Sequence, residues 1–159
     1  MSYSVLFVCL GNICRSPMAE AVFRHLVKRD GLENKITVDS AGTGDWHIGH
    51  PPHEGTRGLL DKLSISSEGM KARQFTSEDG GSFDLIVAMD SKNERDILNI
   101  LQGSDNAPVI RFMSLLPANG SDDVPDPYYS GNFEEVYELV KDGCEILLER
   151  IKGRLEHGE

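Results

Sequence analysis

The chain contains one short segment whose residue types could hold and attack a tetrahedral oxyanion. Cys9 follows an apolar run, Arg15 comes after five intervening residues, and a helical pattern begins directly afterwards. In a loop that closes from a strand into a helix, backbone N–H groups can point inward, where the helix dipole adds positive potential. Arg15 can offer a bidentate fork to two phosphate oxygens. The segment therefore predicts a cysteine nucleophile at the base of an oxyanion-binding loop.

The other residues of this loop support the same chemistry. The positive groups around Cys9 favour its thiolate, which is the nucleophilic form. Asn12 can adopt a positive φ and shape the loop, and the Ser16 hydroxyl can donate to the Cys9 sulfur. The remaining loop positions contribute backbone amides, and they are Leu10, Gly11, Ile13 and Cys14. The alternative, a buried apolar cysteine near a surface arginine, does not account for this strand-to-helix context.

The elements that must position this loop alternate along the chain. Apolar runs predict strands at residues 4–9, 36–38, 83–89 and 109–112. Helical periodicity predicts helices at residues 16–30, 53–63, 91–101 and 133–155. This alternation predicts an α/β fold, with a single domain over residues 1–159 and a four-stranded parallel sheet covered by helices on both faces.

Two helix starts can be predicted in more detail. Ser16 suits the N-cap position with Pro17 in the first turn, and Ser91 to Glu94 has the pattern of a capping box. Ligands of parallel α/β sheets bind outside the carboxyl ends of the strands. The loop after Cys9 and the residue Asp90 both follow predicted strands, so they are expected at that edge. The polar segment 117–132 is long enough to be functional.

Composition limits the classes of partner. The net charge of -10 argues against nucleic acid, because phosphate backbones require a basic surface. No stretch approaches the ~18 apolar residues of a membrane span, and no secretory signal is predicted. Few cysteines without secretory features predict a reduced, cytoplasmic protein. A metal site is not predicted, because neither the spacing of Cys9 and Cys14 nor that of the three histidines within residues 47–53 matches a metal-binding pattern. The three histidines are therefore expected in a solvated loop, and no cofactor is expected.

Several motifs, in order along nearly the whole chain, resemble the low-molecular-weight protein tyrosine phosphatases. They are Val5 to Pro17, Asp39 to Thr43, Ala72 to Gln74, Met89-Asp90 and Val124 to Tyr129. The resemblance implies the flavodoxin-like fold of that family. It also implies hydrolysis of phosphotyrosine and small aryl phosphates through a phosphocysteine intermediate, without a metal or cofactor.

The resemblance implies particular roles for the catalytic residues. Cys9 would attack phosphorus, and Arg15 would bind the phosphate and stabilise the transition state. Asp126 would protonate the leaving phenolate and then activate water, since the phenolate is a poorer leaving group without that proton. Asp90 would orient Arg15. Cys14 could form a reversible disulfide with Cys9 under oxidant and protect it from further oxidation.

The resemblance also implies supporting and substrate-binding residues. Ser40 and Asn12 would bond to each other and hold the loop. Trp46 would stack on the substrate ring at the pocket rim. Tyr128 and Tyr129 would form the facing wall, with Tyr128 as the expected substrate contact. The expected partners are phosphotyrosine proteins, small aryl phosphates and inorganic phosphate or similar oxyanions, and the expected state is a monomer or weak dimer.

Three alternative functions differ from this prediction at particular residues. An arsenate reductase on the same fold would need further redox cysteines, but the distant Cys144 lies on an apolar stripe and is expected to be buried. A protein arginine phosphatase commonly has threonine where this chain has Ile13, a branched residue that favours an aryl phosphate. A non-catalytic phosphate-binding module would be expected to lack Cys9 or Asp126, and this chain has both.

Overall fold

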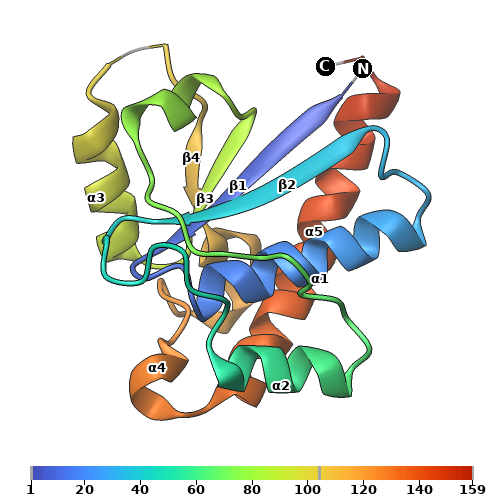
Figure 1. The fold of residues 1–159 in the computed structure, drawn as a ribbon. Helices are drawn as coiled ribbons and strands as arrows, with labels where there is room; N and C mark the ends of the chain where they lie inside the picture. The colour runs from blue at the N-terminus through green and yellow to red at the C-terminus, as the bar shows by residue number, and fades with distance from the viewer. Residues whose placement is uncertain (1, 104, 159) are drawn as a thin grey trace.

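One parallel sheet forms the centre of the molecule. The computed structural model describes residues 2–103 and 105–158. The sheet has the order β2-β1-β3-β4, with strands β1 (Tyr3–Cys9), β2 (Ile36–Gly42), β3 (Leu85–Ala88) and β4 (Val109–Arg111) (Figure 1). All three strand pairings are parallel, so the carboxyl ends meet at one edge. The chain leaves β1 toward β2 on one side and later returns to β3 on the other, which makes this edge a ligand-binding switch point.

Helices cover both faces of the sheet, as the sequence predicted. On one face α1 (Arg15–Arg29) packs with α5 (Phe133–Glu156), and α2 (Glu54–Lys62) packs against both. On the other face lies α3 (Ser91–Leu101) (Figure 1). The short helix α4 (Pro127–Ser130) lies beyond the carboxyl edge, and the 3-10 helices are Ser77–Gly81, Phe112–Leu115 and Pro117–Asn119. In the described part of the chain, none of these helices combines the length and apolar character that a bilayer span requires.

Residues of β1 face two apolar clusters in alternation. Phe7 and Cys9 belong to the cluster under α1 and α5, whereas Leu6 and Val8 belong to the cluster under α3. Because successive strand residues point to opposite faces, a strand buried on both faces needs a continuous apolar run. The same alternation places the Cys9 side chain on the α1 face, at the end of the strand and beside the start of α1.

Some predicted boundaries were wrong. β2 continues to Gly42 rather than ending at residue 38, because it pairs with β1 residue by residue up to the pair Cys9–Gly42. β3 covers Leu85–Ala88 and not all of 83–89, and β4 ends at Arg111. Phe83, Met89 and Phe112 are apolar but lie outside the paired strand residues, so apolar character alone overestimated the lengths of β3 and β4.

Both detailed predictions of helix starts were also wrong. α1 begins at Arg15, and Ser16 lies inside its first turn because the Ser16 hydroxyl faces Cys9 instead of capping the helix. α3 has Asp90 as its N-cap, with the Asp90 carboxylate accepting from the Asn93 N–H, so Ser91 is the first helical residue.

Candidate active site

The sulfur of Cys9 lies at the bottom of the loop that joins β1 to α1. The Ser16 hydroxyl oxygen is 3.0 Å from this sulfur, and the Asn12 backbone N–H donates to it over 3.3 Å. Cys9 is only 3% exposed, yet it lines a pocket at the carboxyl edge. The sulfur can therefore be reached from the pocket while two polar groups from the loop face it.

The Asn12 side chain holds the loop in shape. Asn12 has a φ of 56°, in the left-handed region that few non-glycine residues adopt. Its amide nitrogen donates to the Ser16 hydroxyl over 2.8 Å and to the Ser40 hydroxyl over 2.9 Å. Its carbonyl oxygen accepts from the Arg73 backbone N–H over 3.0 Å, and Ser40 donates to the buried Glu20 carboxylate over 2.6 Å. The unusual backbone conformation is thus fixed by bonds to two other segments.

Arg15 is buried at the start of α1 and is surrounded by acceptors. Its guanidinium donates to Asp90 over 2.6 Å, to the Val124 carbonyl over 3.1 Å and to Asp126 over 3.4 Å. Burial opposes the charged form, but nearby Cys9 and the two carboxylates outweigh it and raise the pKa of Arg15 above its usual value. The guanidinium is therefore a permanent, pre-oriented positive charge beside the cysteine sulfur.

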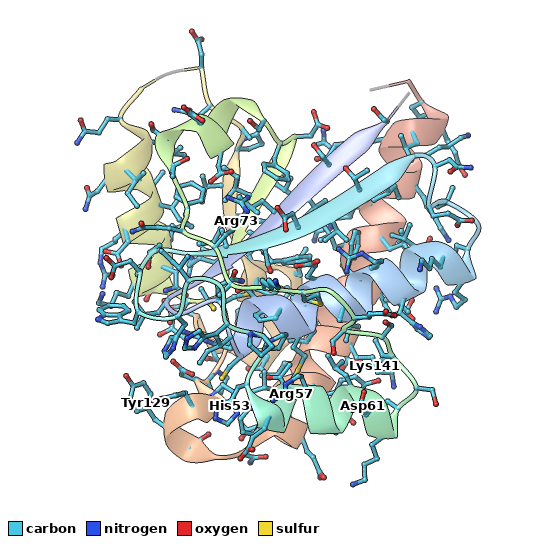
Figure 2. All side chains as sticks on the ribbon, in the orientation of Figure 1. His53, Arg57, Asp61, Arg73, Tyr129 and Lys141 are labelled. Atoms are coloured by element: carbon cyan, nitrogen blue, oxygen red, sulfur yellow. The ribbon has the colours of Figure 1, made fainter. Side chains whose placement is uncertain are left out.

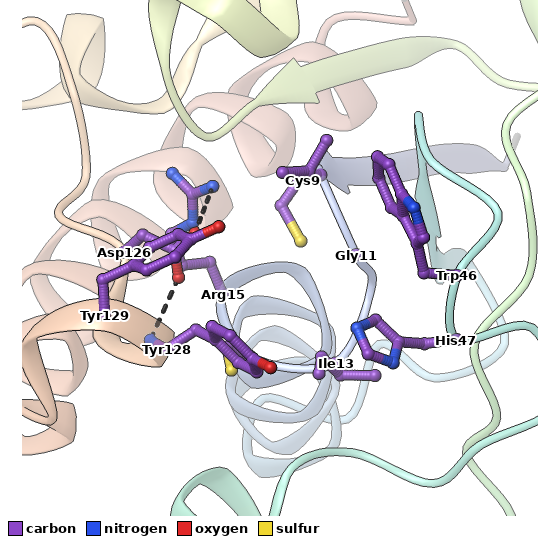
Figure 3. A pocket seen from close by; sticks show the side chains of 11 residues that line it. Cys9, Gly11, Ile13, Arg15, Trp46, His47, Asp126, Tyr128 and Tyr129 are labelled. Atoms are coloured by element: carbon purple, nitrogen blue, oxygen red, sulfur yellow. Dashed lines mark hydrogen bonds and ion pairs between the residues drawn. The ribbon is translucent and has the colours of Figure 1, made fainter.

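Asp126 comes to the site from the opposite end of the sequence. It is the N-cap of α4, and one carboxylate oxygen accepts from the Tyr128 N–H over 3.1 Å. The other oxygen faces the Arg15 guanidinium, as the dashed lines in Figure 3 indicate. The side chain is 24% exposed at the pocket. A carboxyl group in this position can exchange protons with a molecule bound above Cys9.

A pocket of about 320 Å³ joins these residues to an aromatic rim. Figure 3 shows Trp46 and His47 on one side of the Cys9 sulfur and Asp126 with the two tyrosines on the other. Exposure is 67% for Trp46, 52% for Tyr128 and 78% for Tyr129, so the rim is open to solvent. The lining residues are Cys9, Leu10, Gly11, Ile13, Cys14, Arg15, Trp46, His47, Asp126, Tyr128 and Tyr129. Aromatic walls above a cationic base suit an aryl phosphate.

Comparison with known proteins agrees with this geometry. Residues 4–157 match the family described as low molecular weight phosphotyrosine protein phosphatase. The low molecular weight protein-tyrosine-phosphatase YfkJ of Bacillus subtilis is 53% identical over 149 residues, which are 94% of this chain and 96% of that protein. The chain belongs to this family. The corresponding phosphatase PtpA of Staphylococcus aureus is 47% identical over 148 residues, 92% of each chain.

Solved structures extend the family relationship to the fold. The crystal structure of YfkJ aligns with a TM-score of 0.93 at 51% identity and covers 97% of each chain. The crystal structure of DARP, a drosophila arginine phosphatase, aligns with a TM-score of 0.85 at 32% identity and covers 93% of this chain and 97% of that chain. The chain is thus a low-molecular-weight protein tyrosine phosphatase, a cysteine-dependent hydrolase, and its substrates are phosphorylated.

The other two cysteines of the phosphatase lie in unlike surroundings. Cys14 lines the pocket, but burial, followed by the proximity of Cys9 and Asp126, raises the pKa of its thiol to about 12. Cys144 is fully buried in the core under α1 and α5, as the sequence predicted, and burial raises its pKa strongly. All three cysteines are free thiols. Of the three, Cys9 is the cysteine whose sulfur lines the pocket and faces both the Asn12 N–H and the Ser16 hydroxyl.

The phosphatase site also contains residues to which the sequence assigned no role. Glu20 and Arg73 support the loop from behind, and their bonds to Ser40 and Asn12 join segments far apart in the sequence. His47 lines the pocket, although its loop was expected to be only a solvated connection. His53 caps α2, which the predicted start of a helix near residue 53 could have indicated.

Proposed function

We propose that the phosphatase hydrolyses phosphotyrosine in two steps, with Cys9 as the nucleophile. In the first step the thiolate attacks phosphorus, the S–P bond forms and the bond from phosphorus to the phenolic oxygen breaks. Arg15 binds two of the phosphate oxygens, and the loop amides face the charge that develops on them. The single observation that carries this proposal is the Cys9 sulfur in the pocket beside Arg15 and Asp126.

Asp126 is proposed as the acid and then the base. In the first step its proton passes to the leaving phenolic oxygen. In the second step the carboxylate takes a proton from water, the water oxygen bonds to phosphorus, and the Cys9 thiolate leaves. Ser16, within hydrogen-bond distance of the sulfur, stabilises that thiolate. Asp90 holds Arg15 in place through their ion pair.

The pocket rim supports an aryl substrate. Trp46, Tyr128 and Tyr129 can contact a phenyl ring whose phosphate lies against the loop. Ile13 also lines the pocket, and we expect its branched side chain to leave too little room for a guanidinium-linked phosphate. Phosphotyrosine proteins and small aryl phosphates are therefore the proposed substrates. The proposed place of action is the cytoplasm, where a thiol nucleophile stays reduced.

The test compares hydrolysis of aryl phosphates by the wild type, Cys9→Ser and Asp126→Ala, in the presence of a chelator. Cys9→Ser should abolish turnover. Asp126→Ala should lower kcat/KM most for phenols that are poor leaving groups, by about 10²–10⁴-fold, because these need the proton most. Turnover that survives Cys9→Ser would disprove the mechanism. Equal loss for all leaving groups would place the acid elsewhere, and faster hydrolysis of phosphoarginine than of phosphotyrosine would overturn the proposed substrate.

A further inference from the structure

His53 contacts both halves of the proposed machinery, although it does not line the pocket. The loop 44–53 ends at His53, and α2 begins at the next residue. Figure 2 shows His53 at the start of α2, on the side where α4 and Tyr129 lie. The side chain is only partly exposed, so it is not the solvated loop histidine that the sequence suggested.

On one side His53 is attached to the outer part of the phosphate loop. Its backbone N–H donates to the Ile13 carbonyl over 2.7 Å. Three residues later the Thr56 hydroxyl donates to the Cys14 carbonyl over 3.2 Å. These two carbonyls directly precede Arg15, so the first turn of α2 holds the backbone from which the Arg15 side chain extends. Asn12 bonds the loop to Ser40 and Arg73, whereas His53 and α2 bond it at the Ile13 and Cys14 carbonyls.

The His53 imidazole keeps this first turn in place. Its Nδ1 atom accepts from the Gly55 backbone N–H over 3.0 Å, which makes His53 the side-chain N-cap of α2. The cap satisfies an amide that has no partner within the helix. Removing it would loosen the turn that carries the His53 N–H and the Thr56 hydroxyl.

On the other side the His53 ring packs against the segment that carries the proposed acid. It stacks on Phe133, with ring centroids 5.2 Å apart and 20° between the planes. Its edge also meets Tyr128, with centroids 5.9 Å apart and 77° between the planes. Phe133 is the first residue of α5, and the Tyr128 N–H donates to the Asp126 carboxylate. The ring therefore supports the short helix that Asp126 caps.

We infer that His53 is a positioning residue that sets the phosphate loop and the Asp126-bearing helix α4 relative to each other. The Nδ1 cap acts on the loop through α2, and the ring acts on α4 through Tyr128 and on the start of α5 through Phe133. The inference rests on the proposed function, because it assigns the effects of His53 to phosphate binding and to proton transfer. The two contacts can be removed separately, since one uses a ring nitrogen and the other uses the ring surface.

Two substitutions separate these contacts. His53→Asn keeps an acceptor suited to an N-cap but lacks the ring. It should steepen the dependence of log kcat/KM on the pKa of the leaving phenol, with about a fivefold loss for the poorest leaving groups, because aromatic support of the acid segment is lost. His53→Phe keeps the ring but has no acceptor. It should raise the inhibition constant of inorganic phosphate about fivefold and leave the leaving-group dependence unchanged, because only the loop is loosened.

The matched control is His25→Asn. The side chain of His25 is exposed on α1 and forms no hydrogen bond within the described residues, so this variant should match the wild type in both measurements. Wild-type-like constants in both His53 variants would overturn the inference. The inference would also be overturned if both His53 variants lost the same activity with every substrate and that loss paralleled a fall in Tm, because this pattern marks a general stabilising role. Failure of the proposed function would look different, because Cys9→Ser would then retain the wild-type hydrolysis.

Discussion

Arg15 is the residue whose proposed role in phosphate binding depends most on bonds to distant segments of the chain. Its guanidinium bonds reach Asp90, the Val124 carbonyl and Asp126, which lie 75, 109 and 111 residues further along the chain. Each bond uses an N–H group, and together they orient the planar guanidinium toward Cys9. A guanidinium held in this way needs little rearrangement when phosphate binds, which favours affinity and transition-state stabilisation.

Asp90→Asn tests how much of this orientation depends on charge. Asparagine is a good N-cap, so the bond to the Asn93 N–H and the start of α3 should survive. The ion pair with Arg15 should be lost, and kcat/KM for an aryl phosphate should fall by roughly tenfold to a hundredfold. Steady-state kinetics together with urea unfolding check this. Asp90→Ala is the companion variant, and it should lose a further ~1 kcal/mol of stability because the cap is absent as well. Wild-type kcat/KM in Asp90→Asn would contradict the role of the ion pair.

The raised pKa of Cys14 predicts how the thiols react with pH. Because that pKa is about 12, Cys14 stays protonated in the folded protein between pH 6 and 9, and iodoacetamide should label Cys9 but not Cys14. Peptide mapping by mass spectrometry measures this, and Cys9→Ser should leave the pocket unlabelled. In the unfolded chain the Cys14 thiol ionises near the ordinary pKa of 9.0, whereas in the folded protein its pKa is about 12. Between these two pH values only the unfolded state loses the proton, so the free energy of unfolding should fall as the pH rises through this range. Rapid labelling of Cys14 in the folded protein below pH 9 would contradict the expectation.

At the scale of elements, α5 shows how closely the helices approach the core beneath the site. Gly143 lies in α5 against the ring of Phe112, which is fully buried and packs on Phe7 of β1. A Cβ atom at residue 143 would lie 2.3 Å from that ring. The glycine therefore allows α5 to approach the 3-10 helix Phe112–Leu115 closely.

Gly143→Ala should destabilise the phosphatase by about 1–3 kcal/mol, because the added methyl group overpacks the Phe112 ring. Gly153→Ala is the control on the same helix. A Cβ atom at residue 153 meets nothing within 4 Å, so this variant should be stabilised by roughly 0.5–1 kcal/mol through the better helix propensity of alanine. Urea or thermal unfolding of both variants measures the contrast. Equal effects at the two positions would mean that propensity, and not packing, decides.

At the scale of the whole molecule, the site is assembled from the carboxyl edge of the sheet. The loop after β1, Asp90 after β3 and the 117–132 segment after β4 meet there, and Arg15 connects all three. An anion that binds to Arg15 should therefore stabilise the entire fold and not only the loop, because it binds the native state alone.

Inorganic phosphate should raise the Tm of the wild type. At a concentration a hundred times its Kd the gain is about 2.7 kcal/mol, or about 5–10 °C for a chain of this length. Arg15→Met should show little or no phosphate-dependent shift from its own, lower baseline. Differential scanning calorimetry at matched ionic strength, with chloride in place of phosphate, provides the comparison. A full shift in Arg15→Met would mean that phosphate binds away from the pocket.

Much of this architecture could be predicted from local patterns. The strand before Cys9 was recognisable because burial on both faces requires a continuous apolar run. α5 was recognisable because burial on one face leaves an apolar stripe with a helical period. The helix starts were not, because the Ser16 hydroxyl faces Cys9 instead of capping α1, and Asp90, one residue before the expected cap, caps α3. The support of Asn12 by the Arg73 backbone could not be predicted either, since a backbone N–H carries no side-chain signature.

The polarity of the sheet also separates the pocket from the ends of the chain. Burial raises the pKa of Tyr3 at the start of β1, and the nearby charge of Arg154, in the last turn of α5, partly offsets this rise. Both lie at the amino edge of the sheet, opposite the pocket, where Figure 1 shows the start of β1 and the end of α5 close together. A surface anchor, fluorescent label or fused domain attached at this end would leave the aromatic rim facing outward. The enzyme can thus be tethered for single-molecule or surface measurements without covering the pocket.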